Sequence, residues 1–147
     1  MRLEAGSFEV VLVDDGSKDN SVDIVKNFIT KRADYSLIIL ANNMGVNTAR
    51  NEAISVAKGD WLILLDSDDE LCIDGVDMKN ILSKLQGYDL VSFRCKNSLN
   101  ELVGPSKNAP ITLSYIDFLS GKKSFETLDL IRRVKNSEKY FENTVNG

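Results

Sequence analysis

Apolar residues along the first two-thirds of the chain follow two different periods. Four short runs are almost continuously apolar, which is the pattern of strands buried on both faces; they are residues 8–13, 37–41, 61–65 and 89–93. Between these runs, apolar residues recur every three or four positions, as on one face of a helix; these segments are residues 21–31, 48–58 and 75–85. Strands alternating with helices predict parallel pairing through right-handed crossovers. Residues 8–95 are therefore expected to form an α/β domain, an open and mostly parallel sheet with helices on both faces.

Capping residues mark the predicted ends of the helices. Asn20 or Ser21 is suited to cap the first helix, because a short polar side chain can accept its first backbone N–H groups. Gly59 stands where a left-handed glycine would end the second helix, and Gly87 stands at the end of the third.

The remaining third of the chain, residues 96–147, has a weaker pattern. Residues 99–103 predict a short hairpin arm. Residues 113–119 and 125–134 predict helices, the second because its apolar residues lie three apart. A stripe of this kind either packs on its own domain, which we favour, or meets a partner or a membrane.

The amino-acid composition excludes several kinds of catalytic and binding site. The chain has 147 residues and 43% hydrophobic content, which is enough for one domain with a core. It contains no histidine, so Ser-His-Asp nucleophiles and His-ligated zinc are excluded. A net charge of −4 argues against nucleic acid as a partner. Cys72 and Cys95 form no CxxC pair and are interpreted as reduced thiols. The longest apolar runs have five residues, whereas a membrane span needs about 20. We therefore expect a cytoplasmic protein without a transmembrane segment.

Three carboxylates follow the third predicted strand within four residues: Asp66, Asp68 and Asp69. Ligands of open α/β sheets bind outside the carboxyl ends of the strands. Neighbouring carboxylates at such a position repel one another unless a cation lies between them, and hard oxygen ligands favour Mg²⁺ or Mn²⁺ shared with a phosphate-bearing ligand. On this cluster alone, a solvated acidic turn that caps the next helix is an equal alternative.

Two further polar loops fall at the same edge of the predicted sheet. The first follows the first strand and consists of Asp14, Asp15, Gly16 and Ser17. Its carboxylates can accept hydrogen bonds from a base or a ribose, but an ordinary Asp-Gly turn with a capping Ser is slightly favoured on these residues alone. The second loop precedes the second helix and carries Asn43, Gly45 and, in the helix, Arg50. A helix start with a nearby guanidinium suits an anion; the alternative is a surface helix with a solvated Arg.

Taken together, the three loops resemble the motifs of a known protein family. The succession FEVVLVDDGSKDNS, NNMGVNTARNEAISVAKGDW and LILLDSDDEL resembles the family 2 glycosyltransferases of the GT-A fold over residues 7–95. The resemblance implies a Rossmann-like, nucleotide-sugar-binding part over residues 1–95 and a partial acceptor-side, helical extension over residues 96–147. It implies inverting transfer of a sugar from a nucleotide-sugar donor, commonly a UDP-sugar, to a saccharide or lipid-linked hydroxyl acceptor. A role in polysaccharide biosynthesis would fit, and peripheral association with the inner face of a membrane stays open.

Carried over residue by residue, the resemblance implies a role for each motif. Asp15 would contact the uracil, and Asp66 the ribose or, through water, the metal. Asp68 would coordinate Mn²⁺ or Mg²⁺ bridging the diphosphate in the DXD motif, with support from Asp69. The donor-nucleotide site would be completed by Asp14, Gly16, Ser17, Asn43, Gly45 and Arg50.

Two parts of the family pattern are not found in the sequence. Members usually begin with an apolar strand that ends in Pro-x-Tyr-Asn and is followed by a helix, and this strand would lie between the strands at 8–13 and 61–65. The family's catalytic base, often part of a Glu-Asp pair, has no clear counterpart either. Four residues are candidates by charge alone: Asp117, Glu126, Asp129 and Glu142. We therefore expect a truncated domain with an unassigned base and little or no transferase activity of its own.

Two other classes of function stay open. One is a non-catalytic nucleotide-sugar binder or a remnant of an enzyme. The other, less favoured, is a phosphoacceptor receiver domain, with Asp14 and Asp15 as its acidic pair, Asp66 as the acceptor, and Ser92 and Lys96 at later strand ends. In a receiver domain the second loop and the extra carboxylates after Asp66 would have no role.

Overall fold

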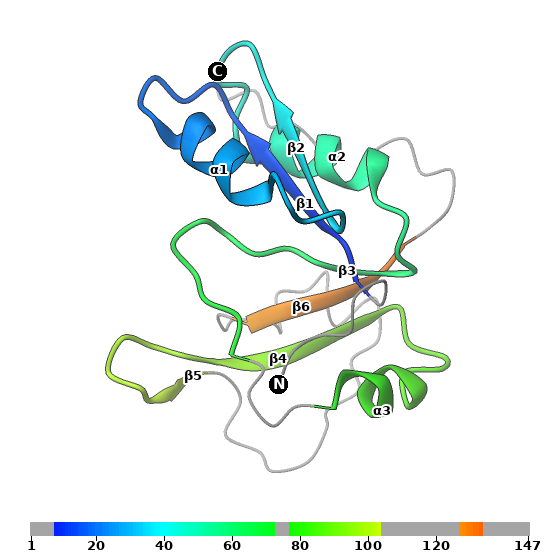
Figure 1. Cartoon of the computed structure of the whole chain (residues 1–147). Coiled ribbons are helices and arrows are strands. Elements are labelled where there is room, and N and C mark those ends of the chain that lie inside the picture. Colours follow the sequence, from blue (N-terminus) through cyan, green and yellow to red (C-terminus); the bar gives the residue numbers. More distant parts are fainter. Residues whose placement is uncertain (1–7, 73–76, 104–126, 134–147) are drawn as a thin grey trace, which may run out of the picture. The chain divides into compact units, whose positions relative to one another are not determined.

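The computed structural model describes residues 8–72, 77–103 and 127–133 (Figure 1). These residues form two compact units. The first unit comprises residues 8–62 together with Arg133, and the second comprises residues 63–72, 77–103 and 127–132. The α/β class predicted from the sequence is confirmed, and the alternating strands and helices predicted up to residue 96 are all present, with ends that shift by a few residues.

The first unit is built on a pair of parallel strands, β1 (Val10–Asp14) and β2 (Tyr35–Ile39). The register runs from Val10 opposite Tyr35 to Asp14 opposite Ile39. Two helices belong to this unit, α1 (Ser21–Ile29) and α2 (Val46–Val56). The first contacts β2 and the second contacts β1 (Figure 1). Parallel pairing brings the carboxyl ends of β1 and β2 to the same edge, and this edge carries two of the three loops singled out in the sequence.

Among the described residues, strand β1 forms backbone hydrogen bonds to another strand along one of its two edges. Its partner is β2 alone, and the N–H of Val10 donates to Asp34 O at 2.7 Å while Asp14 O accepts from the N–H of Leu40 at 2.9 Å. Because successive residues of a strand face opposite neighbours, the backbone groups of Val11 and Val13 point to the other edge. This is the edge where the resemblance expects a further strand.

The second sheet has the order β3-β6-β4-β5. Its strands are β3 (Trp61–Ile63), β4 (Leu90–Lys96), β5 (Leu102–Val103) and β6 (Thr127–Arg132). The hairpin arm predicted over residues 99–103 is confirmed, because β5 pairs antiparallel with β4. β4 differs from expectation, since it also pairs antiparallel with β6. An antiparallel neighbour needs no crossover helix, and this one comes from far along the chain.

The helix predicted over residues 125–134 is wrong where the structure describes it, because Thr127–Arg132 forms β6. The other predicted helix, residues 113–119, lies outside the described residues. Leu130 of β6 lies opposite Val91 of β4 and is only 2% exposed. The other buried apolar side chains among the described residues are Ile54, Leu62 and Leu85.

The predicted caps are only partly confirmed. Asn20 is the N-cap of α1, but its side chain makes no capping hydrogen bond. Asp19 takes this role instead: its Oδ1 accepts from the N–H of Ser21 at 3.0 Å. Hydrogen bonds from the Ser21 side chain and backbone hold the pKa of Asp19 below its usual value. Helix α2 ends at Val56, with Ala57 as its C-cap, so the prediction that Gly59 ends it is wrong.

Gly59 belongs to a short backbone segment that is held from two sides. The Glu9 carboxylate accepts from the N–H groups of Lys58 and Gly59. From the other side, Arg133 donates from Nε to Gly59 O at 2.6 Å and from Nη2 to Lys58 O at 3.0 Å. These backbone groups have no ladder partners, so the two charged side chains satisfy hydrogen bonds that would otherwise be lost.

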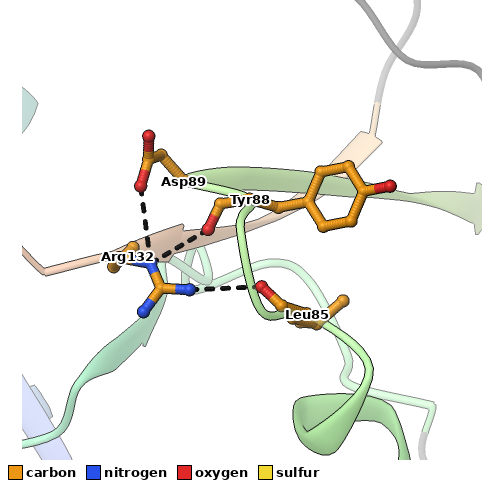
Figure 2. A network of polar contacts seen from close by, with 4 residues as sticks. All are labelled: Leu85, Tyr88, Asp89 and Arg132. Atoms are coloured by element: carbon orange, nitrogen blue, oxygen red, sulfur yellow. Dashed lines mark hydrogen bonds and ion pairs between the residues drawn. The ribbon is translucent and has the colours of Figure 1, made fainter.

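In the second unit, Arg132 also binds backbone carbonyls of a distant segment. It connects β6 to the turn after α3 (Met78–Ser83) (Figure 2). Its Nε donates to Tyr88 O at 2.9 Å, and its Nη2 donates to Leu85 O at 3.1 Å. Leu85 O also accepts from the N–H of Tyr88 at 3.2 Å, and the guanidinium fork binds both carbonyls of this turn at once. The ion pair to Asp89 at 3.4 Å adds little, because that carboxylate is 93% exposed.

None of the helices in the described ranges is long and apolar enough to cross a membrane.

Candidate functional site

The loops after β1 and β2 are joined by the carboxylate of Asp15. Its Oδ1 accepts from the N–H of Met44 at 2.7 Å, and its Oδ2 accepts from the N–H of Gly45 at 2.8 Å. These are short, charge-assisted hydrogen bonds. The structure therefore brings together two of the sequence-predicted loops, residues 14–17 and 43–45, at the carboxyl edge of the parallel pair.

Gly16 makes the contact between the two loops possible. Its φ is +77°, and a Cβ added there would lie 2.6 Å from Asn42 C and 2.7 Å from Asn43 N. A side chain at this position would meet backbone, and L-residues rarely adopt its φ. The Asp-Gly pair predicted as a nucleotide loop is thus first of all a close contact between two backbone segments.

The other polar residues of the two loops accept hydrogen bonds from backbone groups within their own turns. Asp14 Oδ2 accepts from the N–H of Ser17 at 3.0 Å. The Asn43 Oδ1 accepts from the N–H of Gly45 at 3.2 Å, so this N–H is shared between two side chains. Gly45 has a φ of +88° and is the N-cap of α2. Its carbonyl accepts from the N–H of Ala49 at 3.1 Å, which starts the helix.

Arg50 lies in α2 five positions after Gly45, at the end of the first turn and half-buried.

The acidic cluster belongs to the second unit. Asp66, Asp68 and Asp69 follow β3 in a tight turn, in which the N–H of Asp69 donates to Asp66 O at 3.1 Å, and all three are exposed. Among the described residues, no three acidic or thiol side chains converge into a complete metal site. The donor set nevertheless fits Mg²⁺ or Mn²⁺, because such ions are commonly held by one or two carboxylates, with substrate phosphates and water filling the other positions.

Comparison with known proteins distinguishes a glycosyltransferase from a receiver domain. The model of the family described as "Glycosyl transferase family 2" matches residues 2–104, which include all three loops. The chain belongs to glycosyl transferase family 2.

Several curated relatives of this family are similar to the chain. It is 33% identical over 114 residues to an "Uncharacterized glycosyltransferase" of Haemophilus influenzae, covering 78% of this chain and 45% of the relative. It is 39% identical over 70 residues to a "PGL/p-HBAD biosynthesis glycosyltransferase" of Mycobacterium bovis, covering 48% and 27%. It is 28% identical over 126 residues to a "Cholesterol galactosyltransferase" of Borreliella burgdorferi, covering 82% and 33%. The chain thus spans less than half the length of these glycosyltransferases.

The receiver-domain alternative does not fit the sheet. It needs Ser92 and Lys96 at the carboxyl edge of a parallel strand, but both lie on β4, which is antiparallel to its neighbours β5 and β6. Ser92 also donates its hydroxyl to Asp129 Oδ1 at 2.7 Å, across the β4–β6 pair. The family membership and this pairing both argue against a phosphoacceptor role.

Among the four acidic residues considered as a glycosyltransferase base, the structure describes Asp129 alone. Its carboxylate accepts a hydrogen bond from Ser92. Asp117, Glu126 and Glu142 lie outside the described residues. The base therefore stays unassigned.

Sequence reasoning missed three charged residues that bind backbone segments outside the three loops. Glu9, Arg132 and Arg133 each bind backbone groups of a distant segment. Glu9 falls within the strand predicted over residues 8–13, and Arg132 and Arg133 fall within the helix predicted over residues 125–134, so no sequence signal pointed to these contacts. For Asp15, the sequence indicated a polar loop at the end of a strand but not the two amides that its carboxylate binds.

Proposed function

We propose that this chain provides the donor-binding part of a family 2 glycosyltransferase, which transfers a sugar from a UDP-sugar to a hydroxyl acceptor with inversion at C1. The observation that supports this proposal best is the joining of the 14–17 and 43–45 loops by Asp15 at the carboxyl edge of β1 and β2. This edge is where open α/β sheets bind their ligands, and both loops lie inside the family match.

The nucleotide would be held by residues from three loops. We propose that Asp66 contacts the ribose and that Arg50 and the start of α2 face the negatively charged diphosphate. The other donor-binding residues would be Asp14, Asp15, Gly16, Ser17, Asn43 and Gly45.

A divalent cation, Mn²⁺ or Mg²⁺, would be held by Asp68 with Asp66 and Asp69. When bound, it supplies positive charge that stabilises the departing nucleoside diphosphate. The three carboxylates lie on one exposed turn, where their like charges would favour a bound cation.

The reaction itself is a single displacement. A carboxylate base takes the proton of the acceptor hydroxyl, the oxygen forms a bond to C1, and the bond from C1 to the diphosphate oxygen breaks on the opposite face. The electron pair of the broken bond leaves with the nucleoside diphosphate. This step inverts the configuration at C1.

We propose a saccharide or lipid-linked hydroxyl as the acceptor, used at the cytoplasmic face of a membrane. The names of two relatives, a cholesterol galactosyltransferase and a PGL/p-HBAD biosynthesis glycosyltransferase, are the support for a hydrophobic acceptor. Assembly of a polysaccharide or glycolipid would use such a reaction.

The metal assignment predicts that Asp68→Ala weakens Mn²⁺-dependent binding of UDP. Calorimetric titration with UDP and Mn²⁺ is expected to show roughly a tenfold or greater loss of affinity, which is the typical effect of removing one charged contact. Asp89→Ala is the matched control, because Asp89 is in the same unit and 93% exposed. Equal affinities of the two variants would contradict the role of Asp68.

A second candidate function is binding of the nucleotide-sugar without turnover. The observation that favours it is Asp129, the one candidate base that the structure describes, whose carboxylate accepts a hydrogen bond from Ser92. We expect the 147-residue chain to bind UDP with Mn²⁺ but to transfer little or no sugar. Donor turnover with Mn²⁺ and a broad set of acceptors measures this directly. Robust transfer by this polypeptide would rule out the second candidate and support the first.

A further inference from the structure

We propose that the side chain of Met44 packs against the face of the donor's nucleobase and contributes to the affinity for the base. This inference rests on the proposed function, because it adds one residue to the donor-nucleotide site. It gives this site an apolar contact, whereas the other side chains proposed for it are polar or charged.

Large apolar side chains are exposed at the edge that carries the proposed donor site. Met44 is 61% exposed, and Val46, the first residue of α2, is 55% exposed. Ile39, the last residue of β2, is exposed as well. A single exposed apolar side chain is ordinary. Three of them within eight residues, at the edge where open α/β sheets bind ligands, indicate an apolar contact that a ligand would complete.

The backbone of Met44 is held at both of its polar groups. Its N–H donates to Asp15 Oδ1 at 2.7 Å, and its carbonyl accepts from Thr48 Oγ1 at 2.9 Å. Met44 is therefore fixed next to the carboxylate of Asp15, while most of its side chain is exposed. Methionine is flexible and polarizable, so a side chain in this position can adapt to a flat ligand.

A nucleobase needs two kinds of contact, because its edge carries polar groups and its faces are apolar. Each oxygen of Asp15 accepts one backbone N–H, which leaves the outer lone pairs of the carboxylate for a donor on the edge of uracil. Met44 is the neighbour that binds this carboxylate through its own N–H. Its side chain can therefore lie against the face of the same ring, where a thioether and an aromatic ring attract each other.

Calorimetry separates a contact with the base from an effect on the diphosphate. With Mn²⁺ present, Met44→Ala is expected to weaken UDP binding by about two- to tenfold, the range for one contact between a thioether and an aromatic ring. Binding of pyrophosphate, which has no base, should stay unchanged. Val56→Ala is the matched control, because Val56 is an exposed apolar residue at the other end of α2, and it should bind UDP like the wild type. An equal loss for UDP and pyrophosphate, or no loss for either, would overturn the proposal.

Nuclear magnetic resonance tests the contact directly. The chain has three methionines, so the ε-methyl signal of Met44 can be assigned from its absence in Met44→Leu. With UDP and Mg²⁺, we expect nuclear Overhauser effects between this methyl group and the H5 or H6 proton of uracil. Saturating UDP without these effects would overturn this inference alone. If the wild-type chain bound neither UDP nor pyrophosphate, the proposed function would fail, and the inference would fail with it.

Discussion

Gly16→Ala is expected to destabilise the first unit by about 2–5 kcal/mol, the sum of a left-handed backbone cost and an overpacking cost. The φ of Gly16 is +77°, and the new Cβ would lie 2.6 Å from Asn42 C and 2.7 Å from Asn43 N. Backbone atoms cannot move aside as the end of a flexible side chain can. These particular atoms are also held by Asp15 through the next two amides. The free energy of unfolding, measured in urea, and hydrogen exchange at the amides of β1 and β2 report the loss.

Two other glycines separate the causes of this effect. Gly45 and Gly87 have φ values of +88° and +86°, but nothing lies within 4 Å of a Cβ added at either position. The Ala variant of Gly87 carries only the left-handed backbone cost, about 1–2 kcal/mol. Gly45 has a ψ of 158° and lies in a region that glycine alone occupies readily, so its Ala variant is expected to cost about 1–3 kcal/mol. A loss in Gly16→Ala no larger than in Gly87→Ala would show that the close contact between the loops contributes nothing to stability.

The carboxyl-edge loops could be predicted because they depend on local sequence. The apolar run before Asp14 predicts a strand, the polar turn after it ends that strand, and parallel pairing places such turns at one edge. The pairing of Asp15 with Met44 and Gly45 could not be predicted in the same way. These residues are 29 and 30 positions apart, and no sequence periodicity records which of several carboxylates reaches a given backbone amide.

The wrong prediction of a helix at β6 has the opposite cause. The local apolar pattern there does fit a helix, but contacts with distant residues determine the structure. Leu128 and Ile131 lie three apart, which suits a helix, but Leu128 and Leu130 lie two apart, which suits a strand equally well. Over six residues these periods cannot be distinguished. The choice is made by distant partners, since Leu130 lies opposite Val91 and Asp129 opposite Ser92 of β4. Pairing with another strand supplies hydrogen bonds and burial that a short isolated helix lacks.

The prediction that a glycine ends α2 is wrong for a related reason. Gly59 would have been a suitable left-handed end, but the helix stops earlier, at Val56. The segment after it is extended because Glu9 and Arg133 bind its N–H and carbonyl groups. Charged residues from before β1 and after β6 therefore set the end of α2, and a sequence window around the helix contains neither of them.

Leu130→Ala is expected to destabilise the second unit by about 2–5 kcal/mol, because the substitution removes a buried side chain and leaves a cavity. Leu130 is 2% exposed, the lowest value among the buried apolar residues of the described chain, and it lies on the strand between β3 and β4. Leu102→Ala in the same sheet is the control: that side chain is 56% exposed, so its removal should change stability by no more than about 0.5 kcal/mol. Urea unfolding measures both losses, and hydrogen exchange at the amides of β4, which pair with β6, locates the first. Equal losses in the two variants would mean that β6 does not carry the core of this unit, and the sheet order β3-β6-β4-β5 would then give no account of its stability.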